Sequence, residues 1–422
     1  MISNKAYLLG TAITCAVATT FLAPVEPARA DDCLLDRDND GNVDLGSTDN
    51  DGAADSGGVD ARLACGVGAQ ATGGSSTAVG GSSEATGSGS VALGNNADAT
   101  LAGATAIGFL ADATGLDSTA LGNQAVASAE SSIAVGFFSD ATRNNAIAIG
   151  SDGADPDALG AQATGFDSIA LGADADASAD GAISIGRLSD ATGVGAVALG
   201  RSTSAALDAV AVGDGTVANA TAALAVGNGA SANGESAIAL GDDAGASQDD
   251  AIAIGSQSDA TERDAIAIGR VSLASGQTSI ALGAGSRSSS SNAIAIGTTS
   301  NATSSNSVAV GQFAAAEGAD AIALGTSAEG NASSSIAIGV DSKGSGVSSI
   351  AVVRNAFASH NGVSIGAGSS ANSSALALGL QASALDLGAI AIGANLGGGL
   401  AGAQATGNSA VALVTEAAST AN

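Results

Sequence analysis

The stretch DAIAIGSQSDATERDAIAIGRVSLASGQTSIALG, residues 250–283, contains the pattern that decides the fold. A five-residue motif (a small residue, an aliphatic residue, Ala, an aliphatic residue and Gly) ends at Gly255, Gly269 and Gly283, with a period of 14 residues. Twenty-five copies end between Gly80 and Val414, and 18 of their 24 intervals are 14 residues long. This period is too short for a pair of helices, so it predicts an all-β stacked solenoid with two short strands and two turns in each coil.

The columns of the motif alternate in size, as the side chains of a strand do. The residue before the terminal Gly is Ile, Leu or Val in all 25 copies, and the residue between the two aliphatic positions is Ala in 23 copies and Ser in two, Ser184 and Ser364. We expect the aliphatic side chains to point into each coil and the Ala to point outward. Small residues three and five positions after the Gly, as in Ser139-Asp140-Ala141, predict a second strand whose small side chains turn inward beneath the aliphatic ones.

The two turns of each coil also have sequence signals. The motif ends in Gly in 23 copies, which predicts a positive φ or a close approach of backbones. Asp or Asn often stands directly before the motif, as Asp250 and Asn292 do, and these residues favour turns.

The Ala column suggests a surface that another molecule covers. About 25 coils spaced by roughly 4.8 Å form a rod about 120 Å long, and a bare Ala strip along it would expose on the order of 1,000 Å². We therefore predict a side-by-side homotrimer that packs through this column, although Ala can also be a neutral residue at an exposed position. The alanines assigned to the interface are Ala134, Ala148, Ala239, Ala253, Ala267, Ala281, Ala295, Ala309, Ala323 and Ala337.

The composition excludes several classes of function. The chain has 422 residues, a formal net charge of -29, one His, one Tyr and no Trp. Such a charge disfavours nucleic acid and anionic lipid as partners, because both require Lys and Arg. An enzyme is also disfavoured, because acid–base catalysis usually uses His, Tyr or a tuned Lys.

Residues 1–30 have the pattern of a secretory signal peptide. Lys5 precedes an apolar stretch over residues 6–23, and Ala28-Arg29-Ala30 forms an A-x-A cleavage site. A membrane helix is the alternative, but four Thr residues and Pro24 weaken the apolar run. No later segment is long and apolar enough to be a spanning helix, so we expect a secreted protein without a direct membrane span.

Residues 31–65 form an acidic segment bracketed by Cys33 and Cys65. In an oxidising compartment this pair predicts a disulfide, with two free thiols as the alternative. Asp-rich units recur at an offset of 11 residues around Gly41 and Gly52, and alternating carboxylates around a Gly turn are typical of calcium ligands. A solvated acidic linker is the other interpretation. The candidate calcium ligands are Asp36, Asp38, Asp40, Asp44, Asp49, Asp51 and Asp55.

The motifs Ser-Ile-Ala-Leu-Gly and Ala-Ile-Ala-Ile-Gly at this period resemble the YadA-like head domain of trimeric autotransporter adhesins. The resemblance covers residues 66–414 and leaves a tail at 415–422. It implies a left-handed parallel β-roll, three chains around the Ala faces, and adhesion at a bacterial cell surface to an extracellular matrix protein, a polysaccharide surface or sister cells. Members of this family usually continue into a heptad stalk and a membrane anchor. Neither pattern follows Val414, so we expect a head that is released from the cell or held there by another component.

The sequence is also compatible with other functions, and two segments interrupt its repeat. The first alternative is a passive component of a surface layer or biofilm matrix stabilised by calcium; an ice or mineral binder would need regular outward Thr. Residues 151–166, which contain Pro156 and Asp157, and residues 396–400 interrupt the period and are expected to loop out. Exposed Asp residues on adjacent coils are expected to align, as Asp98 with Asp112.

Overall fold

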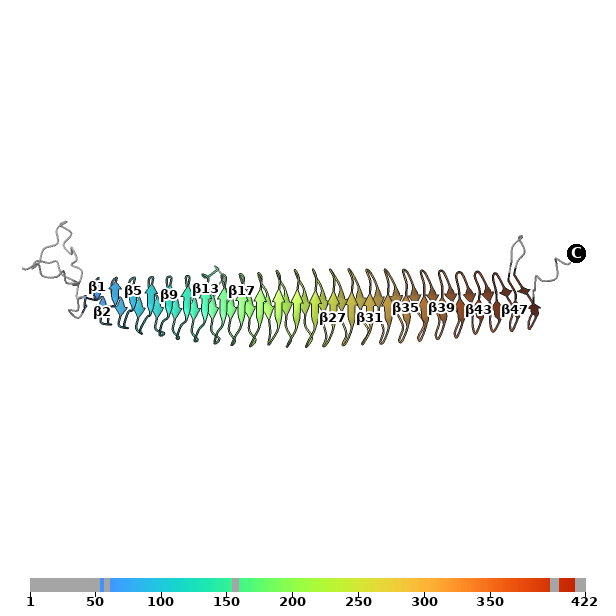
Figure 1. The fold of residues 1–422 in the computed structure, drawn as a ribbon, viewed down its shortest axis with the longest axis horizontal. Coiled ribbons are helices and arrows are strands. Elements are labelled where there is room, and N and C mark those ends of the chain that lie inside the picture. Colours follow the sequence, from blue (N-terminus) through green and yellow to red (C-terminus); the bar gives the residue numbers. More distant parts are fainter. Residues whose placement is uncertain (1–53, 57–60, 154–158, 395–401, 414–422) are drawn as a thin grey trace, which may run out of the picture.

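The chain forms a single long roll of parallel strands (Figure 1). The structure is a computed structural model that describes residues 54–56, 61–153, 159–394 and 402–413. Its described part contains strands and turns but no helix. Each coil contributes one three-residue strand and one two-residue strand, and the coils stack in chain order to form two sheets. This arrangement confirms the predicted all-β solenoid.

The odd-numbered strands coincide with the Ile-Ala-Ile motif and form a 25-stranded sheet, the three-residue sheet. They are β1 (Leu63–Cys65), β3 (Thr77–Val79), β5 (Val91–Leu93), β7 (Thr105–Ile107), β9 (Thr119–Leu121), β11 (Ile133–Val135), β13 (Ile147–Ile149), β15 (Ile169–Leu171), β17 (Ile183–Ile185), β19 (Val197–Leu199), β21 (Val210–Val212), β23 (Leu224–Val226), β25 (Ile238–Leu240), β27 (Ile252–Ile254), β29 (Ile266–Ile268), β31 (Ile280–Leu282), β33 (Ile294–Ile296), β35 (Val308–Val310), β37 (Ile322–Leu324), β39 (Ile336–Ile338), β41 (Ile350–Val352), β43 (Val363–Ile365), β45 (Leu376–Leu378), β47 (Ile390–Ile392) and β49 (Val411–Leu413).

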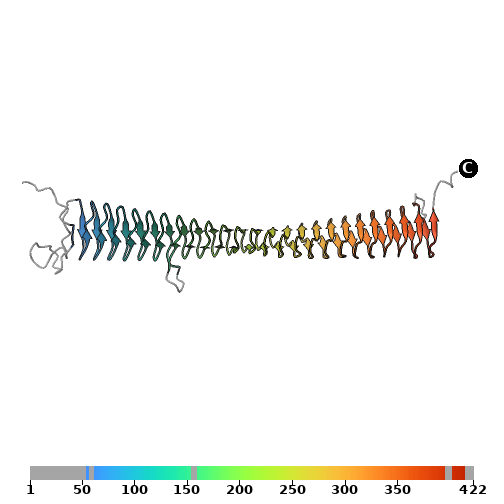
Figure 2. The ribbon, with the colours of Figure 1, turned by 90° about the horizontal axis from the view of Figure 1, so that it is seen from below.

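The even-numbered strands form the second layer, the two-residue sheet. Each begins five residues after the preceding three-residue strand ends, as β12 (Asp140–Ala141) follows β11. The exceptions are β14 (Gln162–Ala163) and β48 (Gln404–Ala405), which follow longer connections. Every strand pairs in parallel with the strand two ahead, in matching register, as Ile252-Ala253-Ile254 pairs with Ile266-Ala267-Ile268. At about 4.8 Å per coil the rod is about 120 Å long, and Figure 2 shows that it twists gradually along its axis.

The roll differs from the predicted set of coils at its start and at the first irregular place. It begins at β1, before the expected start at residue 66, and Asp55 extends the two-residue sheet by a parallel bridge to Gln70. The copy of the motif that ends at Gly160 is not a coil, because Ile149 pairs directly with Leu171. The connection between β13 and β14 (Gln162–Ala163) contains the insertion, as expected, and part of it (154–158) lies outside the described residues, as do 395–401.

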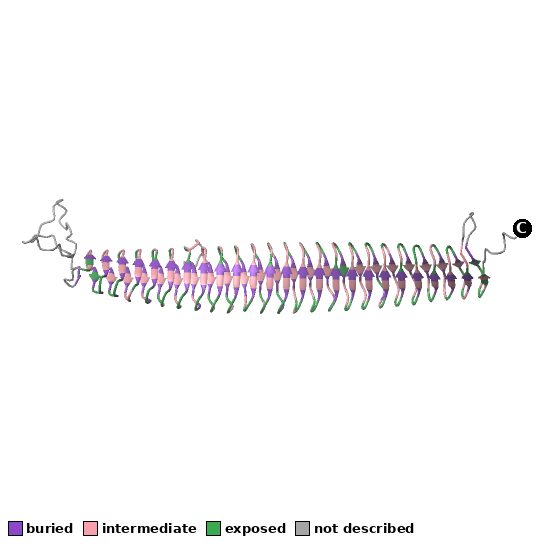
Figure 3. Ribbon diagram, viewed as in Figure 1, coloured by how far each residue is buried: buried purple, intermediate pink, exposed green. Residues whose placement is uncertain are grey.

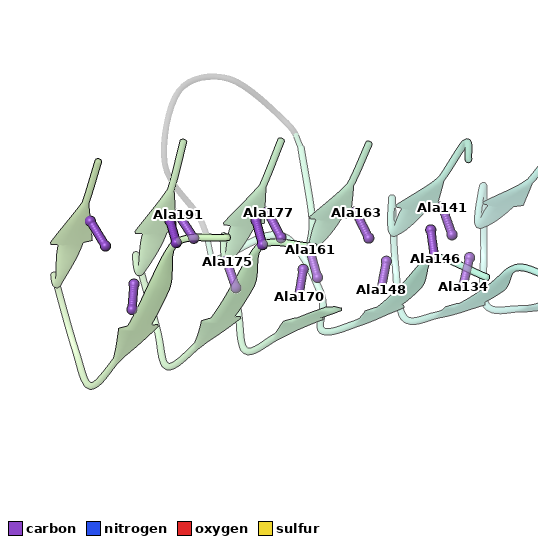
Figure 4. Packing of buried hydrophobic residues seen from close by; sticks show 14 of the residues in the cluster. Ala134, Ala141, Ala146, Ala148, Ala161, Ala163, Ala170, Ala175, Ala177 and Ala191 are labelled. Carbon is purple, nitrogen blue, oxygen red and sulfur yellow. The ribbon is translucent and has the colours of Figure 1, made fainter. Parts of the chain in front are cut away.

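The prediction for the first strand was wrong about which side faces inward. The ten alanines assigned to a trimer interface, among them Ala134, Ala253 and Ala337, are all fully buried inside a single chain. The aliphatic residues that flank them are half-buried or exposed, as Ile149 is at 38%. Figure 3 shows this alternation along the strands, and Figure 4 shows the alanines of both sheets pointing into the space between them. The alanines therefore cannot contact another chain.

The interior is built from small residues alone. The four inward positions of the coil that ends at Gly136 are Ser132, Ala134, Ser139 and Ala141, and none of them has any exposed area. The prediction that the small side chains of the second strand point inward is thus confirmed. They pack against the Ala column of the first strand, however, and not against Ile and Leu. Two sheets with such short strands enclose a space that only methyl and hydroxymethyl groups fill.

Many inward serines make a hydrogen bond within their own coil, although the buried hydroxyls of Ser288, Ser335 and Ser349 make none. Ser139 Oγ donates to the Gly136 carbonyl at 3.1 Å, and Ser132 Oγ donates to the Ala129 carbonyl at 2.6 Å. Where Ser replaces Ala in the central column, as Ser184 does, its hydroxyl pairs with the serine across the roll, Ser189, at 2.6 Å. The same pairing joins Ser364 and Ser369 at 2.6 Å. A buried hydroxyl without a partner is costly, so these pairs explain why the exceptions are tolerated.

The turns follow the sequence signals. Gly136 has a φ of 137°, and a Cβ built on it would lie 2.3 Å from the Gly150 carbonyl oxygen on the next coil. Both predicted reasons for Gly are therefore confirmed at this position. Asp250 and Asn292, directly before their motifs, have positive φ values of 57° and 59°.

Candidate functional site: two opposite faces of the roll

The outward side chains of the three-residue strands form a continuous apolar surface, which we call the aliphatic face. Parallel pairing in register places Ile238, Ile252 and Ile266 in one column, and the residues two positions later form a second column. Two columns about 10 Å wide over about 120 Å give on the order of 1,000 Å². The largest apolar patch of a typical monomer is about 300–600 Å². The face is interrupted near its N-terminal end by Thr77, Thr105 and Thr119.

The outward side chains of the two-residue strands form a polar face on the opposite side of the roll. Asp98 pairs in register with Asp112, and Asp176 with Asp190, so the predicted alignment of carboxylates is confirmed. Burial against the neighbouring coils, and then the charges of Glu84 and Asp112, raise the pKa of Asp98 above its ordinary value. The acidic column therefore stores unfavourable electrostatic energy at neutral pH.

Among the described residues, three carboxylates are neutralised by ion pairs: the Lys343–Glu329 pair lies on the polar face, and the other two pairs lie on turns. Arg201 pairs with Asp214, and Lys343 pairs with Glu329 on the adjacent coil. Arg263 Nη2 lies 2.7 Å from Asp249 Oδ2. All three pairs are largely exposed, so solvent screens them and they contribute little to stability.

Most of the predicted calcium site lies outside the described residues. Only Asp55 of the candidate ligands is described, and its backbone bridges in parallel to Gln70 of β2 (Gln70–Ala71): the Ala71 amide donates to the Asp55 carbonyl at 2.7 Å. Within the described ranges, no three His, Cys, Asp or Glu residues are grouped to hold a metal ion. The calcium site therefore stays a prediction.

Cys65 is the last residue of β1, the first strand of the roll, and it is disulfide-bonded. Its predicted partner, Cys33, lies outside the described residues, as does the predicted signal peptide over residues 1–30. In the part of the chain that the structure describes, no helix is long and apolar enough to cross a membrane.

The phenylalanines that follow the Gly turns are exposed rather than packed into the rim. Phe109, Phe137 and Phe313 are 46%, 39% and 52% exposed. Phe137 and Phe138 contact each other, with ring centroids 4.2 Å apart. The solitary His360 is also exposed on a turn, away from any group of catalytic residues.

The sequence reasoning missed the residues that form the aliphatic face. A usable signal was present: four columns of each coil contain only small residues, and four small columns are enough to fill a thin interior. The large residues then have no place except outside.

Comparison with known proteins agrees with this repeat structure. The family pattern described as "YadA head domain repeat (2 copies)" matches repeatedly and covers more than half of the chain. The matches are residues 71–97, 85–111, 113–139, 131–152, 163–189, 206–230, 232–258, 260–286, 288–314, 302–328, 316–342 and 373–395.

Among solved structures, the chain is similar to the crystal structure of the collagen-binding domain of Yersinia adhesin YadA. The two are 23% identical, and the match covers 42% of this chain and 68% of that chain with a TM-score of 0.19. No curated protein sequence matches the chain. On the strength of its repeats, the chain belongs to the YadA head domain repeat family.

Proposed function

We propose that the protein is a non-enzymatic adhesin head that acts outside the cell as a side-by-side homotrimer. It attaches the cell or its products to surfaces or extracellular matrix, or joins sister cells. The observation that carries the trimer is the aliphatic face, since a stable interface buries about 800 Å² per partner and this face is larger.

The energy of association favours burial of this face. At about 25 cal/mol per Å², covering on the order of 1,000 Å² contributes roughly 25 kcal/mol per face, against about 4–15 kcal/mol of lost rotational and translational freedom. A second copy of the chain is a suitable partner, because its face has the same length, twist and apolar character. This replaces the expected Ala interface with one made by Ile, Leu and Val.

The N-terminal expectations complete this proposal. Residues 1–30 direct export, Cys33 pairs with Cys65, and the acidic segment binds calcium beside the first coil. A melting curve of residues 31–422 with and without a chelator tests the calcium site; identical curves would remove it from the proposal.

Sedimentation of residues 31–422 tests the assembly, and we expect a trimer. The double substitution Ile252→Ser and Ile254→Ser removes two aliphatic side chains from each of three chains, at about 1.5–3 kcal/mol per side chain. It should shift the equilibrium strongly toward monomer. Val217→Ser on the polar face is the matched control, since its register neighbours Ser204 and Ser231 are already Ser. A stable wild-type monomer would refute the trimer.

Adhesion needs a separate measurement on collagen-type, fibronectin-type and polysaccharide-coated surfaces. Saturable attachment of the wild-type trimer supports an adhesin. Self-assembly without saturable attachment would instead indicate a passive structural component of a surface layer or matrix.

A further inference from the structure

The charge of the roll changes abruptly between Asp264 and Glu317. The chain has 41 acidic residues among 422, yet this stretch has none, and its only charged residues are Arg270 and Arg287. The stretch spans about four coils, or roughly 20 Å of the rod. The chain as a whole has a net charge of -29, and we call this stretch, residues 265–316, the window, because none of its own side chains would repel an anionic ligand.

The polar face shows the same change in its outward column. The position that Asp occupies on β28 (Asp259–Ala260) is held on the next coils by Leu273, Arg287, Asn301 and Ala315, in register. Arg287 is thus flanked by an apolar and an amide side chain rather than by carboxylates.

A polar hollow of about 410 Å³ lies at this place. Arg287, Ser289, Thr299, Asn301 and Thr303 are among the residues that line it.

A second hollow of about 370 Å³ shares Ser289 and continues over Gln277, Ser290 and Ser291 toward the turn, where the Glu262 carboxylate, just outside the stretch, also lines it. Together the two hollows cross the width of the polar face. An elongated polar surface of this kind suits a chain-like ligand better than a compact one.

The Arg287 guanidinium is free to bind a ligand. It is exposed, and among the described residues it makes no ion pair and no hydrogen bond. Arg201 and Arg263, by contrast, are both occupied by an Asp carboxylate. A planar guanidinium binds a carboxylate through two parallel hydrogen bonds. The surrounding hydroxyl and amide groups match the hydroxyls of a sugar.

We propose that Arg287 and the hollows around it form a binding site for an acidic polysaccharide whose sugars bear carboxylates. The inference deepens the proposed adhesive function by naming a class of ligand, and so rests on it. The site lies on the side of the roll opposite the aliphatic face, so trimer formation through that face leaves it open.

An acidic peptide fits this site less well. β32 (Arg287–Ser288) is paired on both sides, with β30 (Leu273–Ala274) and with β34 (Asn301–Ala302), so no strand edge is open for a peptide main chain.

Calorimetric titration of residues 31–422 at low salt tests the site, with a hexamer of galacturonate as the probe. We expect saturable binding that weakens as salt is added. Arg287→Gln should lower the affinity at least about tenfold, because a charge-assisted bidentate contact is lost. Arg354→Gln, which removes an equal charge from an exposed turn outside the window, should leave the affinity unchanged. Neutral maltohexaose should not bind.

Asn301→Asp provides a second variant that keeps Arg287. Asp already stands in this column on several other strands, among them β28, so the variant should fold, and the new carboxylate should occupy Arg287 and abolish binding. The proposal is overturned by wild-type protein that fails to bind, by undiminished binding of Arg287→Gln, or by an equal loss in Arg354→Gln. Hexaglutamate that binds as tightly as the galacturonate would also overturn it. Each of these results leaves the trimer and its surface attachment standing, because those are measured by sedimentation and adhesion.

Discussion

Replacing Ala253 by Leu tests which side of the first strand faces the interior. Ala253 is fully buried and is stacked in register between Ala239 and Ala267 on the neighbouring coils. Across the roll it faces the layer that contains Ser258 and Ala260 of its own coil. Leu adds three carbon atoms to a space that is already filled on every side.

The cost follows from the stiffness of the surroundings. Overpacking a core usually costs about 1–3 kcal/mol, because side chains and backbone shift to make room. Here the neighbours above, below and opposite are themselves small residues bound into the two sheets, so there is no flexible side chain to move. We therefore expect Ala253→Leu to lower the free energy of unfolding by about 3 kcal/mol or more.

Urea denaturation followed by circular dichroism measures the effect at a fixed chain concentration. Ala253→Ser is the matched control, since Ser258 stands where Ser189 pairs with Ser184 at 2.6 Å. This control should stay within about 1 kcal/mol of wild type, because the new hydroxyl finds a partner. If Ala253→Leu unfolds at the wild-type urea concentration, the inward placement of the Ala column is wrong.

Three further substitutions probe the turns, the polar pairs and the acidic column. Gly255→Ala should destabilise the roll by at least about 2 kcal/mol, because φ is 127° and the new Cβ would lie 2.7 Å from the Gly269 carbonyl carbon; an unchanged urea midpoint would contradict this. Ser189→Ala should cost about 1–3 kcal/mol by leaving the buried Ser184 hydroxyl unpaired, and adding Ser184→Ala should recover most of that loss in a double-mutant cycle. Burial raises the pKa of Asp176 above its ordinary 3.8, so the folded state binds more protons than the unfolded state and stability falls as pH rises through the raised pKa. Asp176→Asn should therefore melt higher than wild type at pH 7 and gain less on acidification toward pH 4, whereas equal melting curves at both pH values would contradict the burial effect.

The sequence predicted the period, the number of strands per coil and the residues of the turns. These features depend on local chemistry: Gly where φ is positive and backbones nearly touch, and Asp or Asn at the left-handed position before many of the motifs. It also predicted the inward side of the second strand correctly. The local pattern was sufficient there because the residues three and five positions after the Gly, which share one side of the strand, are small.

The direction of the first strand could not be obtained in the same way. Alternation separates two faces of a strand without stating which one is inside, and the usual rule places large apolar residues in the core. In this roll the distance between the two sheets decides which side of the strand faces inward. Ala134 and Ser139, from opposite sheets, already fill the space between them. The candidate ligand site was missed for a different reason. The absence of carboxylates between Asp264 and Glu317 was visible in the sequence, but the position of Arg287 among its neighbours requires the register of the coils.

In the proposed trimer, the inverted placement ties the stability of one chain to the presence of the others. Inside the roll each coil buries only small side chains, whose transfer from water contributes little because their apolar area is small. The larger apolar area belongs to the Ile, Leu and Val columns, which a lone chain leaves half-exposed. Hydrogen bonds between successive coils give the chain its shape, and in the proposed trimer the burial of the aliphatic face adds the larger share of the hydrophobic stabilisation. A polar interface variant should therefore lower both assembly and resistance to unfolding, because the same side chains supply both.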